Sequence, residues 1–323
     1  MINLPMTCRM LKSELSRFEK SLNNLFSKQD GVGRKLYLHQ EKVRGKRLRP
    51  ILLFLSARAS GRVKPVHFDM ALIVELIHNA TLAHDDVLDD SKLRRYLPTI
   101  NQKWGNEMAI LYGDLIFSNA FKTCARIKSN EVVTIISGTV SRMCYGELAH
   151  TERRFDFSLT EKEYLEIIEQ KTATLFATAC YLGAIFTSND KRYHSALKNY
   201  GLNFGMAYQI MDDYLDCTST ENAIGKTAGT DLAKGKMTLP LILLLKSLPA
   251  NERKKVKRIM SSSSQPGLMK YNANLGFTSV GKEVLKTARR YSEKAVNSLK
   301  VLPDSTEVRL LGTLAESIIP KNN

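Results

Sequence analysis

Apolar residues recur every three or four positions along most of this chain, with polar residues between them. In the N-terminal part the repeat consists of Leu11, Leu15, Phe18, Leu22 and Leu25. This spacing places the apolar side chains on one face of a helix. It also predicts helices at 51–59, 68–90, 108–127, 132–148, 161–182 and 193–215. No alternating run with hairpin turns predicts a sheet, so the expected fold class is all-α.

Gly, Pro, Ser and Asn residues predict the breaks between these helices. The expected loops are 60–62, 96–98, 188–190, 218–235 and 261–267. The serine-rich stretch 261–267 is the best linker candidate, but too few helices follow it to build a second core. We therefore expect one domain that spans residues 1–323.

The composition is that of an ordinary globular protein, with 323 residues, 43% hydrophobic and 25% charged. The apolar stretch 239–245 contains a proline and is too short to span a bilayer. Residues 1–14 lack the apolar region of a signal peptide. The scattered cysteines form no CxxC pair, which indicates reduced core thiols in a cytoplasmic protein. They are Cys8, Cys124, Cys144, Cys180 and Cys217.

The formal net charge is +16, with an excess of basic residues at 253–258 and 286–290. Their helical spacing predicts a solvated basic face. Interleaved aromatic residues and a nucleic-acid-binding motif are both absent from the sequence, which argues against nucleic acid as the partner. A phosphorylated small substrate agrees with the same charge.

Two aspartate clusters stand in apolar sequence, at 85–90 and at 212–216. In each cluster the first and last Asp of a DDxxD pattern are four residues apart, so on a helix they share one face. A solvated acidic helix end would explain either cluster alone, but the recurrence in apolar surroundings argues against it. Neighbouring carboxylates require cations, and oxygen ligands without His or Cys favour Mg²⁺. Because water and phosphate oxygens usually complete Mg²⁺ coordination, we expect a diphosphate ligand.

Basic residues occur next to polar or glycine-rich motifs elsewhere in the chain. They are Lys46, Arg47 and Arg49 in 45–50, the pair Arg94-Arg95, Lys171 beside Thr172, Lys226 and Lys236. Each alone could be a surface cation, but together with two acidic clusters they indicate diphosphate binding. The sequence has no recognisable nucleophile arrangement and no Walker loop. Metal-assisted departure of a diphosphate in a dry cavity is the chemistry that remains.

On these motifs the chain resembles the trans-polyprenyl diphosphate synthase family over almost its whole length. The matching stretches, in the family's order, are 45–50, 75–95, Gly113-Asp114 with Phe117, Gly146-Glu147, Lys171-Thr172, 204–216 and 225–240. The resemblance implies a single domain of antiparallel helices around a deep central cavity. It also implies the condensation of isopentenyl diphosphate with an allylic diphosphate, such as farnesyl diphosphate, with release of pyrophosphate. The expected assembly is a homodimer, or a complex with a small second subunit.

The same resemblance assigns roles to individual residues. The Mg²⁺ ligands would be Asp85, Asp86, Asp89, Asp212, Asp213 and Asp216. The allylic diphosphate would be bound by Lys171, Lys236 and Arg94, and isopentenyl diphosphate by Lys46, Arg49, His78 and Arg95. Thr172 and Gln209 would aim oxygen dipoles at the developing allylic cation, and Lys226 would contact phosphate from its loop. The departing pyrophosphate is expected to take the proton, so that no protein base is required.

Three positions depart from the family pattern. Tyr96 follows the arginine pair where Gly is usual, Arg44 replaces a Gly before Gly45, and His150 stands in place of a common Gln. The turn at Tyr96 is expected to be shaped differently. None of the three removes a charged group that the mechanism requires.

The residues that precede the first cluster bear on product length. A prenyl tail that runs down this helix at about 1.5 Å per residue would pass Thr81 and then Ala80. Short-chain members of the family tend to place a bulky aromatic residue there. Small residues therefore suggest a medium- to long-chain product, of the hexaprenyl to octaprenyl types. The alternative is that Ala80 packs against a neighbouring helix and another side chain closes the cavity.

Three other functions remain open from the sequence. A class I terpene cyclase would ionise a diphosphate with Mg²⁺, although its second metal motif typically uses Asn, Ser and Glu. A non-catalytic partner subunit would usually lose one acidic cluster. A basic protein that binds RNA or a membrane surface would leave the carboxylates unexplained.

Overall fold

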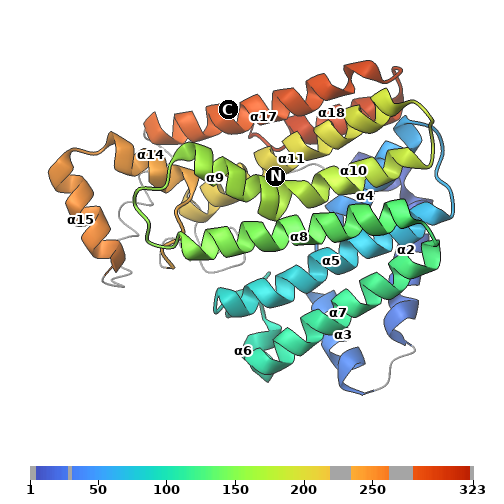
Figure 1. The fold of residues 1–323 in the computed structure, drawn as a ribbon, viewed down its shortest axis with the longest axis horizontal. Coiled ribbons are helices and arrows are strands. Elements are labelled where there is room, and N and C mark those ends of the chain that lie inside the picture. The colour runs from blue at the N-terminus through green and yellow to red at the C-terminus, as the bar shows by residue number, and fades with distance from the viewer. Residues whose placement is uncertain (1–4, 28–30, 219–233, 262–278, 321–323) are drawn as a thin grey trace.

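The computed structural model describes residues 5–27, 31–218, 234–261 and 279–320, which form long helices packed side by side (Figure 1). In chain order the elements are α1 (Pro5–Met10), α2 (Lys12–Ser27), α3 (Val32–Lys42), α4 (Leu48–Ala59), α5 (Val66–Leu88), β1 (Leu93–Arg94), β2 (Leu97–Pro98), α6 (Ile100–Trp104), α7 (Asn106–Ile127), α8 (Asn130–Glu152), α9 (Glu161–Ile168), the π-helix η1 (Glu169–Ala173), α10 (Thr174–Ile185), α11 (Lys191–Thr218), α14 (Leu239–Ser247), α15 (Ala250–Ser261), α17 (Ser279–Ser298), the 3₁₀-helix η2 (Leu299–Val301) and α18 (Thr306–Glu316). The expected all-α class is confirmed.

Each predicted helix is present with ends that shift by a few residues. The stretch 161–182 is one continuous helical run, but it contains the π-helix η1 between α9 and α10. The expected loops at 60–62 and 188–190 separate helices, whereas most of 218–235 and of 261–267 lies outside the described residues. The 3.6-residue apolar repeat was sufficient to predict these helices because each helix buries one face against its neighbours.

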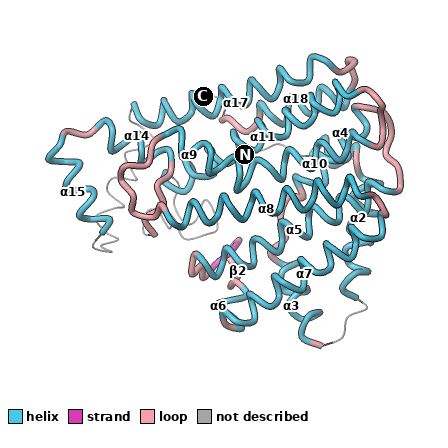
Figure 2. The backbone as a smooth tube through the Cα atoms, viewed as in Figure 1, coloured by secondary structure: helices cyan, strands magenta, loops and turns pink. Residues whose placement is uncertain are grey.

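The loop expected at 96–98 is only partly present, because Tyr96 lies in a turn but Leu97–Pro98 is a strand. Leu93–Arg94 and Leu97–Pro98 pair as a short antiparallel hairpin, which Figure 2 draws in magenta. Its two turn residues, Arg95 and Tyr96, have φ values of 51° and 66°. Positive φ at both central residues is typical of the tightest hairpin turns. Neither residue favours that conformation, so local residue preferences do not predict a hairpin here.

Helix α11 packs closely against the run from η1 to α10, and a glycine permits this approach. A Cβ added at Gly205 would lie 2.6 Å from the Cα of Ala173. Only a residue without a side chain fits there. The contact brings the end of α11, with the second aspartate cluster, beside Lys171 and Thr172 of η1.

The cysteines and the basic face can be compared with their predictions. All five cysteines are free; Cys124, Cys180 and Cys217 are buried as expected. Cys144 is exposed, so the expectation that every cysteine is a core thiol was wrong. The basic side chains at 253–255 and 289–290 are exposed, which confirms a solvated face. Within the described residues, no helix combines the length and apolarity that a bilayer crossing requires.

Candidate diphosphate and metal site

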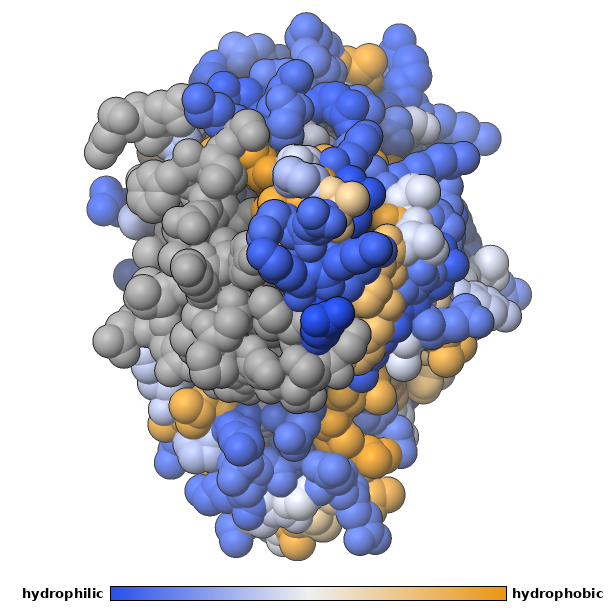
Figure 3. Space-filling model, turned by 90° about the vertical axis from the view of Figure 1, so that its left-hand side faces the viewer, coloured by the Kyte–Doolittle hydropathy of each residue, from blue (hydrophilic) through white to orange (hydrophobic). Residues whose placement is uncertain are grey.

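The two aspartate clusters lie at the C-terminal ends of α5 and α11, at the same left-hand end of the molecule in Figure 1. Figure 3 views that end directly. Among the described residues visible on this face, hydrophilic side chains predominate, and apolar ones form a narrow strip between them. Both helices deliver their carboxylates at this end because each helix stops within or just after its cluster.

The first cluster is held by cations from three parts of the chain. Asp86 is buried and accepts a hydrogen bond of 2.8 Å from Arg94 Nη2. Asp89 lies 2.6 Å from Lys236 Nζ and 3.4 Å from Arg154 Nη2. Burial, together with Glu147 and Asp89, raises the pKa of Asp85 to about 6, although Lys171 opposes the shift. The neighbouring cations therefore do not fully compensate the charge of Asp85.

The second cluster divides into carboxylates with different surroundings. Asp213 and Asp216 are buried, whereas Asp212 is exposed, so burial of the whole cluster was a wrong expectation. Asp213 accepts hydrogen bonds of 2.7 Å from Tyr164 and from the Gln209 amide. These two bonds orient Gln209. Asp212 is the member of this cluster that faces solvent.

Aspartates of both clusters raise the pKa of the Arg94 guanidinium. Burial lowers the pKa of Arg94, but Asp86, Asp85 and Asp212 outweigh this effect and raise it. The two acidic groups therefore lie around a common space. Among the described residues, no three His, Cys, Asp or Glu side chains converge closely enough to hold a metal by themselves. Mg²⁺ is commonly bound by one or two carboxylates, with water and substrate phosphates as its other ligands.

Lys171 and Thr172 project from the π-helix η1. Lys171 pairs with Glu147 of α8, and Thr172 donates a hydrogen bond of 2.9 Å to Gln209 Oε1. Single-turn π-helices often occur at functional sites because they displace side chains from the regular helical positions. Here the displaced turn places an ammonium and a hydroxyl beside the aspartates.

A second group of cations lies around His78. Burial, followed by Arg49, Arg94 and Arg95, holds the pKa of His78 well below its usual value, so this imidazole is neutral. Burial also lowers the pKa of Arg49 to about 10. The Arg49 Nε atom is buried and has no hydrogen-bond partner within the described part of the chain, and its guanidinium lies 4.1 Å from the centre of the Phe176 ring. Such a group is ready to bind an anion.

Arg95 approaches the motif 45–50 from the hairpin. Its Nη1 donates a hydrogen bond of 2.8 Å to the carbonyl oxygen of Val43. A Cβ added at Gly45 would lie 2.8 Å from Arg95 Nη2, so the glycine leaves room for the guanidinium. Lys46, next in the chain, has an exposed side chain. The structure thus brings Arg49, His78 and Arg95 together and leaves Lys46 at the rim.

Four residues around this site received no role from the sequence. Arg154 and Glu147 pair with Asp89 and Lys171, Tyr164 binds Asp213, and Arg47 is buried among carboxylates. Glu147 stood in the Gly146-Glu147 motif and Arg47 among the basic residues of 45–50, whereas Arg154 and Tyr164 had no sequence signal. Tertiary contacts determine what each of the four binds. Lys226, which was expected to contact phosphate, lies outside the described residues.

The three departures from the family pattern leave the site intact. Tyr96 adopts a left-handed φ of 66° in the position where the family usually has Gly. Arg44 has no positive φ and its Nη1 lies 3.7 Å from Glu19. His150 is partly exposed near the end of α8.

The expected chain-length residues lie on α5 below the first cluster. Ala80 has no exposed surface, whereas Thr81 is partly exposed and its hydroxyl donates to the His78 carbonyl. Of the two, Thr81 is the residue beside accessible space. The assignment of both as chain-length residues stays a prediction.

These observations define an all-α protein with clustered carboxylates beside two groups of cations. The family model described as Polyprenyl synthetase matches residues 34–274. Component 2 of the heptaprenyl diphosphate synthase of Bacillus subtilis is 36% identical over 285 residues, which cover 87% of this chain and 80% of that protein. An all-trans-nonaprenyl-diphosphate synthase of Rhodobacter capsulatus is 35% identical over 269 residues, or 83% and 82% of the two chains.

A comparison with solved structures indicates the same family as these two relatives. The polyprenyl synthase from Caulobacter crescentus, crystallised with calcium and isoprenyl diphosphate, superimposes with a TM-score of 0.91 at 31% identity. The match covers 98% of this chain and 97% of that one. The chain belongs to the polyprenyl synthetase family. The resemblance inferred from the motifs is confirmed, and with it the prenyltransferase class.

Proposed function

We propose that this protein condenses isopentenyl diphosphate with an allylic diphosphate, such as farnesyl diphosphate, in a Mg²⁺-dependent reaction. The product is a longer all-trans polyprenyl diphosphate, and pyrophosphate is released. The bond between the allylic carbon and the diphosphate oxygen breaks, a carbon–carbon bond forms with isopentenyl diphosphate, and a proton leaves the new chain. The departing pyrophosphate takes that proton.

A difference in charge balance between the two halves of the site carries this proposal. In the half with the aspartates, each cation already has a carboxylate partner: Lys171 with Glu147, Lys236 with Asp89 and Arg94 with Asp86. In the half around His78, Arg49 and Arg95 make no ion pair with any described carboxylate. The first half requires metal before it binds a diphosphate, and the second does not.

The donor set of the first half fits Mg²⁺. Asp85, Asp89 and Asp212 offer carboxylate oxygens at the edge of the common space, and bound Mg²⁺ would neutralise charge on the leaving diphosphate. Asp86, Asp213 and Asp216 lie deeper and complete the proposed acidic set. Lys171, Lys236 and Arg94 would contact the phosphate oxygens directly.

Two polar side chains of this site would stabilise the allylic cation. The Thr172 hydroxyl donates to Gln209 Oε1, and Asp213 fixes the other end of that amide. Their oxygens therefore have a fixed orientation before the reaction begins. A preorganised dipole stabilises developing charge without reorganisation.

Binding measurements test the charge difference. We expect isopentenyl diphosphate to bind with similar affinity in Mg²⁺ and in EDTA by calorimetry, and farnesyl diphosphate to bind only with Mg²⁺. Arg49→Gln should weaken the binding of isopentenyl diphosphate and leave the binding of farnesyl diphosphate nearly unchanged. An equal metal requirement for both ligands would contradict the assignment. Incubation with labelled isopentenyl diphosphate then gives product lengths, and a cyclised hydrocarbon would favour a cyclase.

Exposed apolar side chains on α7 and α8 support the homodimer that is expected from the sequence. Ile110, Leu111 and Phe121 of α7 are exposed, as are Tyr145 and Leu148 of α8. Large apolar side chains gathered on neighbouring helices are typical of an interface between subunits. We propose a homodimer through this face. The relative named component 2 supports a small second subunit as the alternative, and sedimentation of the purified chain distinguishes the two.

The remaining expectations stay proposals. The names of the heptaprenyl and nonaprenyl relatives support a medium- to long-chain product. Helix α17 packs along α11, which supports one domain for residues 1–323. Product analysis by mass and limited proteolysis test these two points.

A further inference from the structure

Arg47 lies in the turn between α3 and α4, within the motif that also carries Lys46 and Arg49. Its backbone has a φ of 53°, in the left-handed region, at the N-cap of α4. This conformation is unfavourable for any residue with a side chain. It persists in a protein only where surrounding contacts determine it.

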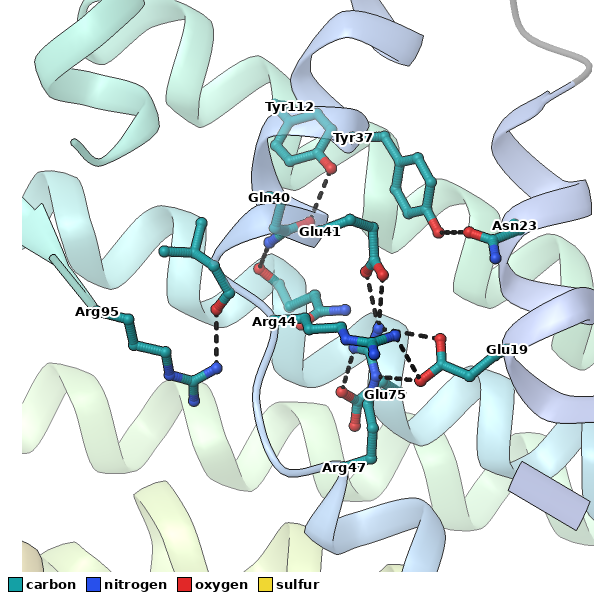
Figure 4. A network of polar contacts seen from close by, with 12 residues as sticks. Glu19, Asn23, Tyr37, Gln40, Glu41, Arg44, Arg47, Glu75, Arg95 and Tyr112 are labelled. Carbon is teal, nitrogen blue, oxygen red and sulfur yellow. Dashed lines mark hydrogen bonds and ion pairs between the residues drawn. The ribbon is translucent and has the colours of Figure 1, made fainter. Parts of the chain in front are cut away.

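The contacts of the Arg47 side chain meet this requirement. Its guanidinium lies 2.8 Å from Glu41 of α3, 2.8 Å from Glu75 of α5 and 3.0 Å from Glu19 of α2. Figure 4 shows the three carboxylates arranged around it from different helices. Arg47 is 7% exposed and Glu75 is 3% exposed. A guanidinium binds three carboxylates at once because its donors form a rigid planar fork.

These carboxylates occupy the Arg47 donors, although the guanidinium lies close enough to His78 and Arg95 to lower the pKa of both. Arg49, two residues further on, has its guanidinium over Phe176 beside His78. Glu75 precedes His78 by three residues, so both lie on one face of α5. At the start of the turn, the Val43 carbonyl accepts the hydrogen bond from Arg95. The turn is thus bound to α5 at one end and to the hairpin at the other.

We propose that Arg47 is a positioning residue for the isopentenyl half of the site, an inference that rests on the proposed function. It binds no substrate. Its ion pairs hold the turn in its left-handed conformation, and the turn places Lys46, Arg49 and the docking point of Arg95. The three carboxylates also neutralise Arg47, so a diphosphate binds the neighbouring cations instead.

Arg47→Lys tests this role because it keeps the charge and removes the fork. We expect the KM for isopentenyl diphosphate to rise at least about tenfold, while the KM for the allylic substrate changes less than about twofold. Glu19→Gln, which removes the negative charge from the longest of the three contacts, should shift the same constant in the same direction by less. This graded effect on one substrate distinguishes positioning from general loss of stability.

Arg58→Lys is the matched control. Arg58 Nε donates to Glu14 at 2.9 Å, an ion pair between α2 and α4 outside the substrate turn. We expect this variant to lower the thermal midpoint without changing either KM. If folded Arg47→Lys keeps both constants, or raises both equally, Arg47 has no positioning role.

A binding assay keeps the inference separate from the proposed function. Wild-type protein that fails to elongate farnesyl diphosphate would contradict the proposed function itself. Titration with inorganic pyrophosphate in EDTA still measures the cation half without turnover. Weaker binding by Arg47→Lys than by Arg58→Lys supports positioning, and equal binding by both overturns it.

Discussion

Lys236 Nζ lies 2.6 Å from Asp89 Oδ2, although 147 positions separate the two residues in the chain. The side chain of Lys236 is 7% exposed, so water screens this pair only weakly. Burial opposes ionisation of Asp89, but Lys236, Lys234 and Lys171 together lower its pKa. One ammonium therefore already neutralises a carboxylate that the proposed Mg²⁺ would bind.

Lys236→Met should change metal binding and substrate binding in opposite directions. Without substrate, we expect Mg²⁺ to bind the variant more tightly than the wild type, because the competing ammonium is gone. The allylic substrate loses a cationic contact, so its KM should rise about tenfold or more. Calorimetry with Mg²⁺ alone and steady-state kinetics measure the two effects. Lys246→Met, on the exposed surface of α14, should change neither. Weaker Mg²⁺ binding by Lys236→Met would contradict the competition.

Tyr164→Phe should lower kcat more than either KM. The variant removes the Tyr164 donor to Asp213 and loosens the residue that orients Gln209. We expect kcat to fall about tenfold and the free energy of unfolding to fall by about 1–3 kcal/mol. Tyr200→Phe removes a buried hydroxyl that donates to the Leu311 carbonyl at 2.8 Å. Tyr200 precedes Asp212 by 12 positions on α11, which is about 18 Å along the helix axis. Tyr200→Phe should cost stability but leave kcat unchanged. Equal kcat in the wild type and Tyr164→Phe would refute the orienting role.

The protein should lose stability below about pH 6.5 in part through His78. Burial and the neighbouring arginines hold the pKa of the folded imidazole well below its usual 6.5. The unfolded chain therefore binds the proton first as the pH falls, which favours unfolding. The contribution of the neutral His78 imidazole to the free energy of unfolding is fully present above pH 6.5 and decreases below it. His78→Asn should reduce the change in melting temperature between pH 7.5 and pH 5.5. Burial also lowers the pKa of His67, so the His78→Asn variant should keep part of the dependence of melting temperature on pH.

Thr81→Phe and Ala80→Phe should both shorten the product mixture, with different costs to stability. Ala80 has no exposed surface, so a phenyl ring there would overpack the core and lower the free energy of unfolding by about 1–3 kcal/mol. Thr81 is partly exposed, and we expect a smaller loss. Mass analysis of the products and thermal unfolding measure the two effects. Unchanged chain lengths in both folded variants would show that the tail does not follow this face of α5.

The candidate site was only partly predictable from the sequence. The aspartates stood out because charged residues in apolar sequence are costly without partners. Lys171, Thr172 and Arg94 received their roles from the motifs that the chain shares with the family. Arg47 stood in the recognised motif but carried no signal that its side chain faces α2, α3 and α5. Tyr164 and Arg154 lie in ordinary amphipathic sequence, and their roles depend on which helices meet.

The sequence by itself determined the helices and the two acidic ends of α5 and α11, because periodicity and residue type are local properties. Only the tertiary structure decided which of these aspartates is exposed and that Lys236 meets Asp89. It also decided the left-handed turn at Arg95 and Tyr96, which local preferences disfavour. The physical reason is that an ion pair or a strained turn between distant segments is stable only after packing removes water and fixes the backbone.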